Sequence, residues 1–263
     1  MGGRWRASIL LMATVVGVLV GAGTAAAAGP GYVALGDSYS SGVGTRAYIN
    51  DGTSCQRSVY AYPQLVATAL HASLSFQACS GAATKDVLGN QLGTLSASTA
   101  YVTITVGGND AGFSSVIERC AEPWPITCTA QIAAAQNLIR TTLPGRLDTV
   151  YNAIRSRAPH ARVIVVGYPR LFDGRTCNLL ARISAAEETA LNATADLLAT
   201  TTQTRAAAHG FAFVDARTAF AGHEICAGVE WLNGLSYPVS ESYHPNRAGQ
   251  IGFAGLVRPA LLG

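Results

Sequence analysis

The sequence predicts an α/β fold in which a mostly parallel sheet is covered by helices on both faces. Short runs of apolar and β-branched residues alternate along the chain with longer segments of helical composition, and this alternation is typical of βα units. Apolar residues form 49% of the 263 positions, which is ample for a substantial core. No linker or break in composition divides residues 29–263, so we expect a single domain.

Five short apolar runs are predicted to form the strands of the sheet. Tyr101–Val106 is the clearest of them, because β-branched residues dominate it. The first run ends directly before a Gly-Asp-Ser tripeptide, and the third ends before Gly107-Gly108. In chain order the predicted strands are Tyr32–Leu35, Leu74–Ala78, Tyr101–Val106, Arg162–Gly167 and Phe211–Asp215.

Five longer segments are predicted to be helices. The first opens near Pro63, since proline is tolerated in a first helical turn. Pro144 and Gly145 lie inside the longest segment and are expected to kink or divide it. Ser184 stands three residues before Glu187, which is a capping-box pattern for a helix start. In chain order the predicted helices are Tyr62–His71, Phe113–Arg119, Ala130–Arg157, Ser184–His209 and Arg247–Leu262.

Residues 1–28 have the pattern of an export signal peptide. Arg4 and Arg6 precede an uncharged apolar stretch, and the small residues Ala26-Ala27-Ala28 end just before Gly29. The competing interpretation is a retained membrane anchor, but the apolar stretch is short for a span of about 20 residues. We therefore expect cleavage after Ala28 and a secreted, extracellular mature protein.

The charge and the cysteines narrow the class of protein further. The formal charge falls from +3 to +1 when Arg4 and Arg6 are removed, and no run of basic residues suggests nucleic acid as a partner. An even number of cysteines in an exported chain indicates disulfides. Metal binding is the other interpretation, and the lack of a Cys-x-x-Cys or His-rich spacing disfavours it. The six cysteines are Cys55, Cys79, Cys120, Cys128, Cys177 and Cys226.

Gly36-Asp37-Ser38 follows the first predicted strand directly and makes Ser38 the candidate nucleophile. Open α/β sheets bind ligands at the carboxyl ends of their strands, and this turn presents a hydroxyl there. Gly, Asp and Ser are also common turn residues, so a plain turn is the alternative. A serine nucleophile needs a base and oxyanion donors. Two further strand ends, Cys79-Ser80-Gly81-Ala82 and Gly107-Gly108-Asn109-Asp110, contain small residues that can expose backbone donors.

His244 is the preferred candidate for the base. Pro245 follows it and disfavours a helical conformation, so we expect His244 in an extended loop that the last helix anchors. His223 lies in a glycine-containing loop and is the second choice. Glu241 or the main-chain carbonyl of Ser242 could orient the imidazole of His244. The remaining histidines fall at predicted helix ends or at the amino edge of the sheet: His71, His160 and His209.

Four blocks of the chain together resemble the SGNH, or GDSL, hydrolase family. Their order and spacing extend the resemblance over essentially all of residues 29–263, and with the signal peptide and six cysteines the chain looks closest to the secreted bacterial lipases and phospholipases A1 of that family. The resemblance implies a three-layer α/β/α fold with a flavodoxin-like sheet of about five strands. The blocks are Gly36-Asp37-Ser38, Cys79-Ser80-Gly81-Ala82, Gly107-Gly108-Asn109-Asp110 and Glu241-Ser242-Tyr243-His244-Pro245.

The resemblance also implies roles for individual residues. Ser38 is expected to be the nucleophile and His244 the base, with Glu241 as a possible third member of a triad. The oxyanion hole is expected to comprise the backbone N–H groups of Ser38 and Gly81 and the side chain of Asn109. No metal or organic cofactor is implied. The implied disulfides follow chain order: Cys55–Cys79, Cys120–Cys128 and Cys177–Cys226.

Two positions depart from the family pattern. Tyr39 stands where the family has leucine, and we expect this change to alter local packing only. Glu241 stands where the family usually has aspartate, three residues before the histidine. Similar secreted relatives can use the main-chain carbonyl two residues before the histidine, which here belongs to Ser242.

These observations predict a serine ester hydrolase that cleaves carboxylic esters of lipids, as a monomer with transient contact to a lipid surface. A carbohydrate acetyl esterase on the same fold is the first alternative, and a secreted binding module without catalysis is the second. The chain has no Gly-x-Ser-x-Gly segment, which disfavours the α/β-hydrolase fold. Several loop residues could line an acyl groove or pack into the core instead: Tyr39, Tyr48, Trp124, Ile126, Trp231, Leu232 and Tyr237.

Overall fold

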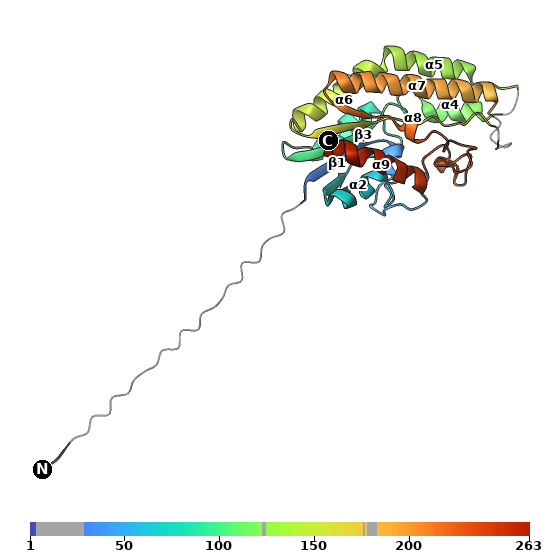
Figure 1. The fold of residues 1–263 in the computed structure, drawn as a ribbon. Coiled ribbons are helices and arrows are strands. Elements are labelled where there is room, and N and C mark those ends of the chain that lie inside the picture. The colour runs from blue at the N-terminus through green and yellow to red at the C-terminus, as the bar shows by residue number, and fades with distance from the viewer. Residues whose placement is uncertain (4–28, 123–124, 176, 178–182) are drawn as a thin grey trace.

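A five-stranded parallel sheet lies at the centre of the computed structural model, which describes residues 1–3, 29–122, 125–175, 177 and 183–263 (Figure 1). The strand order is β2-β1-β3-β4-β5, which is the flavodoxin-like order. All four neighbouring pairs are parallel, so the predicted sheet is confirmed. The strands are β1 (Gly31–Gly36), β2 (Ser73–Phe76), β3 (Thr99–Thr105), β4 (Arg162–Val166) and β5 (Ala212–Val214).

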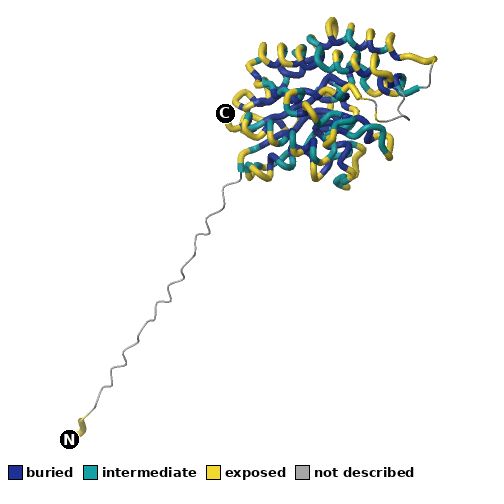
Figure 2. Tube along the Cα trace, turned by 45° about the vertical axis from the view of Figure 1, so that its right-hand side comes forward, coloured by how far each residue is buried: buried dark blue, intermediate teal, exposed yellow. Residues whose placement is uncertain are grey.

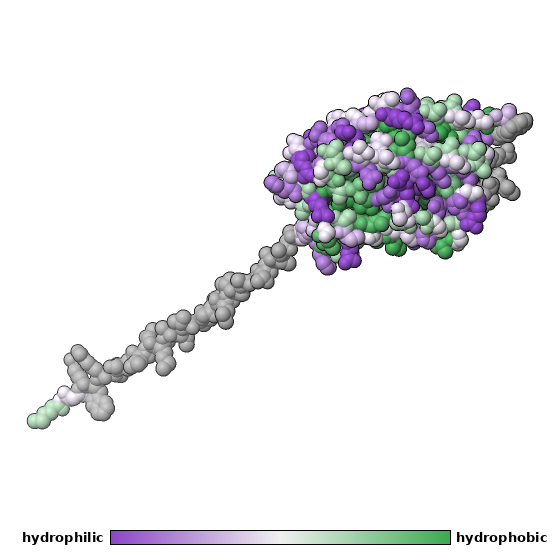
Figure 3. Space-filling model, turned by 45° about the horizontal axis from the view of Figure 1, so that its top comes forward, coloured by the Kyte–Doolittle hydropathy of each residue, from purple (hydrophilic) through white to green (hydrophobic). Residues whose placement is uncertain are grey.

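Helices cover both faces of this sheet, as the sequence predicts. α2 (Tyr62–Leu70) and α9 (Arg247–Leu262) pack together on one face, and α5 (Thr129–Thr141), α6 (Leu143–Arg157) and α7 (Ala185–Ala208) pack together on the other (Figure 1). Exposed residues follow the outward sides of the helices, and buried residues fill the middle layer (Figure 2). Polar and apolar residues share the face drawn in Figure 3.

The order of the strands places the switch point of the sheet between β1 and β3. From β1 the chain moves outward to β2, and it then returns to the other side of β1 to form β3. Helices that follow the two strands therefore diverge, leaving a crevice at their carboxyl ends. The remaining, shorter elements are α1 (Ser38–Ser41), α3 (Thr84–Asp86), η1 (Val87–Gln91), η2 (Leu92–Thr94), α4 (Phe113–Cys120), α8 (Ala216–Ala219) and η3 (Val239–Glu241).

Two boundaries differ from the sequence-based expectation in an informative way. The second strand ends at Phe76 and not at Ala78, because the backbone N–H groups of Gln77 and Ala78 both donate to the carbonyl of Ala34 and bend the chain across the end of β1. The long helical segment is divided at Thr142, so that Pro144 lies in the first turn of α6. The interpretation of Pro144 as a dividing residue is confirmed.

Three disulfides join the cysteines in chain order: Cys55–Cys79, Cys120–Cys128 and Cys177–Cys226. This is the pairing that the family resemblance implies. Most of the predicted signal peptide, residues 4–28, lies outside the described residues. Within the described part of the chain, no helix combines the length and the apolar character needed to cross a membrane.

Candidate active site

The turn that carries Ser38 is held on both sides. Gly36 has a φ of +120°, and a Cβ there would meet the carbonyl oxygen of Thr105 at 2.3 Å, so only glycine allows this approach to β3. The side-chain amide of Gln91 accepts from the N–H of Gly36 at 2.7 Å and donates to its carbonyl at 2.9 Å. Gln91 thereby satisfies the backbone of β1 beyond the point where β2 has ended.

Ser38 is the first residue of α1 and lies next to the imidazole of His244. Asp37 caps this helix, because its carboxylate accepts from the N–H of Tyr39 at 3.0 Å. The Oγ of Ser38 is 2.8 Å from Nε2 of His244, and only 8% of the serine is exposed. The structure therefore brings together the two residues that the sequence singled out from opposite ends of the chain.

The hydrogen bond at Nδ1 of His244 identifies the tautomer of the imidazole ring. Nδ1 lies 2.9 Å from the carbonyl oxygen of Ser242, which can only accept a hydrogen bond, so Nδ1 carries the proton and donates it. Nε2 of the neutral ring is then free to accept from the hydroxyl of Ser38. Burial lowers the pKa of His244 to about 4, which keeps the imidazole neutral at neutral pH.

Glu241 forms no hydrogen bond with His244 among the described residues. The expectation that Glu241 is a third member of a triad is therefore wrong. Glu241 is only 1% exposed, and its carboxylate accepts from the hydroxyl of Tyr48 at 2.5 Å. The guanidinium of Arg46 lies 3.4 Å from its other oxygen. Glu241 ends the short helix η3, whereas Ser242 is extended and turns its carbonyl to the imidazole. Glu241 therefore connects its own loop to the segment that contains Arg46 and Tyr48.

Tyr39 does more than change local packing, so that expectation is too narrow. Its hydroxyl donates to the carbonyl of Tyr243 at 2.7 Å, directly before His244. Its ring lies 5.5 Å from the imidazole, centroid to centroid. A leucine at this position would fill space without providing the hydrogen bond. Tyr39 thus connects α1 to the loop that carries His244.

The two other predicted strand ends are joined to each other. The amide nitrogen of Asn109 donates to the carbonyl of Ala82 at 3.0 Å, next to Gly81. The backbone N–H of Gly81 takes part in no hydrogen bond within the described part of the chain. The N–H of Ser38 belongs to the first turn of α1, where no helical carbonyl can accept it. Asn109 and Ser38 both line the pocket described below.

An apolar pocket beside Ser38 is lined by the segments that follow β1, β3 and β4 and by the helices α4, α5 and α7. It encloses about 690 Å³ of space, including the solvent at its mouth. Of the seven aromatic and apolar loop residues proposed for an acyl groove, only Tyr39 lines it. Trp124 lies outside the described residues. The apolar lining comes mainly from Phe113, Val116, Ala135, Ile139, Leu171, Leu191 and Leu198.

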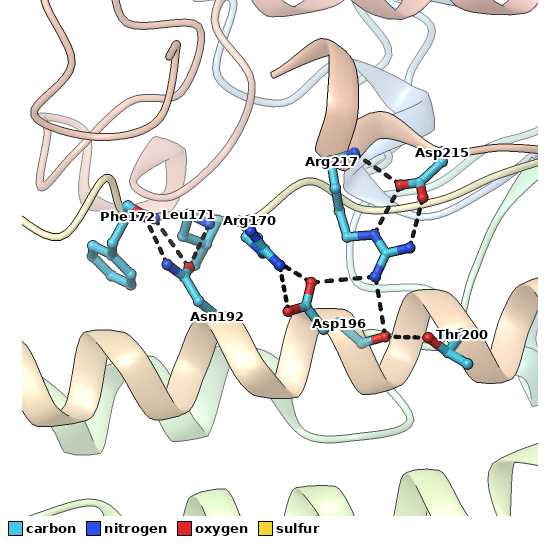
Figure 4. Close-up of polar contacts among 8 residues, drawn as sticks. All are labelled: Arg170, Leu171, Phe172, Asn192, Asp196, Thr200, Asp215 and Arg217. Atoms are coloured by element: carbon cyan, nitrogen blue, oxygen red, sulfur yellow. Dashed lines mark hydrogen bonds and ion pairs between the residues drawn. The ribbon is translucent and has the colours of Figure 1, made fainter. Parts of the chain in front are cut away.

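Polar contacts hold α7 against the carboxyl-edge loops, and these fix one wall of the pocket (Figure 4). The side-chain amide of Asn192 accepts from the N–H groups of Leu171 and Phe172 and donates to the carbonyl of Phe172. Asp196 binds the guanidinium groups of Arg170 and Arg217, which follow β4 and β5. Leu191 and Leu198, on the same helix, line the pocket. The wall that α7 forms cannot shift without breaking these contacts.

His223, the second candidate for the base, makes its contacts with other residues. Its Nδ1 pairs with the carbonyl of Val229 at 2.8 Å, and its ring stacks on Trp231 at 4.0 Å. Among the described residues, one group has the spacing of metal ligands, namely Cys120, Cys128 and Glu187. The sulfurs of Cys120 and Cys128 are bonded to each other, so this group offers no thiolate pair.

Two residues of the site, Gln91 and Tyr168, were not predicted from the sequence. The hydroxyl of Tyr168 donates to the carboxylate of Asp37 and accepts from the N–H of Gly108 at 3.1 Å. Burial raises the pKa of Asp37 to about 7. A signal for Tyr168 exists, since Gly167-Tyr168-Pro169 ends the fourth predicted strand at the same edge as Ser38. Gln91 has no comparable signal, because it follows no strand.

The parallel sheet and the Ser38–His244 pair at its carboxyl edge define a hydrolase of the SGNH type. The chain belongs to the GDSL-like Lipase/Acylhydrolase family, whose sequence model matches residues 34–250. It is 50% identical to Lipase 1 of Streptomyces coelicolor over 241 residues, 89% of each chain. It is a carboxylic ester hydrolase, and the alternative of a non-catalytic binding module is set aside.

Solved structures agree with this assignment. The crystal structure of an extracellular lipase from Streptomyces rimosus matches with a TM-score of 0.82 and 47% identity, covering 88% of this chain and 97% of that one. A phospholipase A1 from Streptomyces albidoflavus matches with a TM-score of 0.83 and 46% identity, covering 89% and 99%. This chain therefore has the same fold as these two enzymes and belongs to the same family.

The Glu241 carboxylate can be tested by an isosteric change. We expect Glu241→Gln to keep kcat/KM for a short-chain ester within about tenfold of wild type, because both ring nitrogens of His244 are bonded to other groups. The amide oxygen can still accept from Tyr48. A triad carboxylate would behave differently, with a loss of about 10⁴-fold on amidation. Steady-state kinetics of both proteins separates the two cases.

The lowered pKa of His244 predicts a pH dependence of stability. Its folded pKa, about 4, lies below the ordinary value of 6.5, so between these values the folded protein binds fewer protons than the unfolded chain. The contribution of His244 to the free energy of unfolding therefore rises with pH through this window. Urea unfolding of wild type and His244→Gln at several pH values checks it. Parallel profiles for the two proteins would contradict the lowered pKa.

Proposed function

We propose that this chain is a secreted lipase that hydrolyses carboxylic esters of lipids through an acyl-enzyme at Ser38. The observation that carries the proposal is the Ser38 Oγ, which lies 2.8 Å from Nε2 of His244 in a residue that lines an apolar pocket. A nucleophile with a base in hydrogen-bond contact can attack an ester carbonyl, and the pocket suits the acyl chain. No cofactor is needed for this chemistry.

In the first half of the reaction, Ser38 Oγ bonds to the ester carbonyl carbon as Nε2 of His244 takes the hydroxyl proton. The carbonyl oxygen becomes an oxyanion, for which the N–H groups of Ser38 and Gly81 and the amide of Asn109 are the donors. The carbon–oxygen bond to the alcohol then breaks, and His244 returns the proton to the departing alcohol. The carbonyl of Ser242 keeps Nδ1 protonated throughout.

In the second half, water replaces the alcohol. His244 takes a proton from water as the water oxygen bonds to the acyl carbon. The bond to Ser38 then breaks, the serine oxygen recovers a proton from His244, and the fatty acid leaves. A neutral carbonyl stabilises the transient imidazolium less than a carboxylate would, so most of the charge stabilisation falls to the oxyanion donors.

The substrate class is inferred from the pocket and from the relatives. A wall of apolar side chains from three helices favours a hydrocarbon chain over a polar group. Relatives at close to half identity are called lipases and phospholipase A1, which supports lipid esters. An acetyl group would fill only a small part of the pocket, so a carbohydrate acetyl esterase is less well supported.

Several features support extracellular action at a lipid surface. The Streptomyces rimosus relative is an extracellular lipase, and this chain has three disulfides. Residues 1–28 are proposed to be a cleaved signal peptide. Tyr237 and Val239, 89% and 67% exposed, lie on the loop that leads to His244 and could touch a lipid aggregate transiently. We propose that the mature enzyme, residues 29–263, acts as a monomer.

The direct test is hydrolysis of a substrate panel by the mature protein. The panel runs from a short-chain ester through a long-chain triglyceride to a phospholipid. We expect Ser38→Ala to lose about 10⁴-fold or more on the best substrate. Ser98→Ala is the control, because that serine is exposed beside the opposite edge of the sheet. The proposal fails if folded Ser38→Ala keeps its rate.

The acyl pocket predicts a change in chain-length preference. Ala135 on α5 is buried and lines the pocket, so Ala135→Phe should fill part of it. We expect the ratio of kcat/KM for p-nitrophenyl palmitate over p-nitrophenyl butyrate to fall by about tenfold or more, since a blocked pocket rejects the longer chain. Ala134→Phe, on the exposed side of the same helix, is the matched control. An unchanged ratio in Ala135→Phe would place the acyl chain elsewhere.

A further inference from the structure

The residues directly before two of the proposed oxyanion donors are joined through a single hydroxyl. Asp37 precedes Ser38 at the end of β1, and Gly108 precedes Asn109 after β3. The hydroxyl of Tyr168, which follows β4, bonds to both Asp37 and Gly108. Three strand ends therefore meet at one oxygen atom.

The roles at this oxygen are fixed by the groups around it. The N–H of Gly108 can only donate, so the Tyr168 oxygen accepts it at 3.1 Å. The tyrosine's own hydrogen is then given to Oδ2 of Asp37. Burial raises the pKa of Tyr168 well above its ordinary value, so the hydroxyl keeps this hydrogen.

Local structure explains why Tyr168 reaches both partners. Pro169 follows it and disfavours a helical backbone, which keeps the residue extended at the sheet edge. A Cβ on Gly108 would meet the tyrosine oxygen at 3.2 Å, so the missing side chain gives the N–H room to approach. The ring is held edge-on against Tyr39 at 5.1 Å between centroids.

We propose that Tyr168 is a positioning residue for ester hydrolysis, whose hydroxyl sets the spacing between the backbone N–H of Ser38 and the side chain of Asn109. The inference rests on the proposed function, because it takes these two groups as oxyanion donors. Donors stabilise a tetrahedral oxyanion only within a few tenths of an ångström of the right place. Asn109 also bonds to Ala82, so the same spacing extends to the loop of Gly81.

Tyr168→Phe removes this one oxygen and keeps the ring that lines the pocket. With p-nitrophenyl butyrate we expect kcat to fall about ten- to hundredfold, while KM changes by less than about threefold. The control is Tyr151→Phe on α6. Tyr151 is fully buried, and its hydroxyl has no hydrogen-bond partner among the described residues, so kcat should be unchanged.

A second measurement separates positioning from loss of folded enzyme. An alkylboronic acid forms a tetrahedral adduct when its boron bonds to Ser38 Oγ and the serine proton passes to His244, and one boron-bound oxygen then occupies the oxyanion position. We expect Tyr168→Phe to weaken boronic acid inhibition by about the factor lost in kcat. All rates are expressed per active site, counted by stoichiometric reaction with a fluorophosphonate.

The outcomes distinguish this inference from the function on which it rests. If Ser38→Ala keeps its rate, the proposed function itself fails. If Ser38→Ala is inactive but Tyr168→Phe has the wild-type kcat per active site and wild-type boronic acid affinity, only the positioning role is overturned. A lower count of active sites with unchanged kcat per site would likewise reduce Tyr168 to a purely structural residue.

Discussion

The sharp turn at the end of β1 is the constraint on which the rest of the site depends. Gly36 can approach the carbonyl of Thr105 only because it has no side chain, and Asp37 then continues the pairing with β3 by donating its N–H to the same carbonyl. On the other side, where β2 has ended, the side-chain amide of Gln91 bonds to the N–H and the carbonyl of Gly36. Ser38 follows this turn as the first residue of a helix, so its position is set before any catalytic contact forms.

The neighbours of Ser38 connect it to the other loops of the sheet edge. Asp37 reaches the loop after β3 through Tyr168, and Tyr39 reaches the loop of His244 through its own hydroxyl. Among the described residues, the hydroxyl of Ser38 has one hydrogen-bond partner, the imidazole of His244. A nucleophile should be positioned by its neighbours and not by bonds to its own oxygen, because such bonds would have to break during attack.

The sequence predicted the elements whose signals are local. The strand from Tyr101 was predicted from its β-branched residues, and Ser38 and His244 were chosen as candidates from the residues beside them. The pocket could not be predicted, because Ala135 and its neighbours are ordinary helix residues until α5 packs against α4, α6 and α7. Glu241 was misplaced for a related reason: spacing from His244 does not reveal that Tyr48, almost two hundred residues away in the chain, will bind its carboxylate.

The acceptor that orients His244 has a consequence for how such a chain can change over generations. A triad carboxylate is specified by its own codon and is lost with one nucleotide change. The carbonyl of Ser242 belongs to the backbone, so every codon at that position encodes it, provided that the new side chain keeps the extended conformation. Mutations therefore abolish this contact by changing the conformation of the loop, and not by replacing one particular side chain.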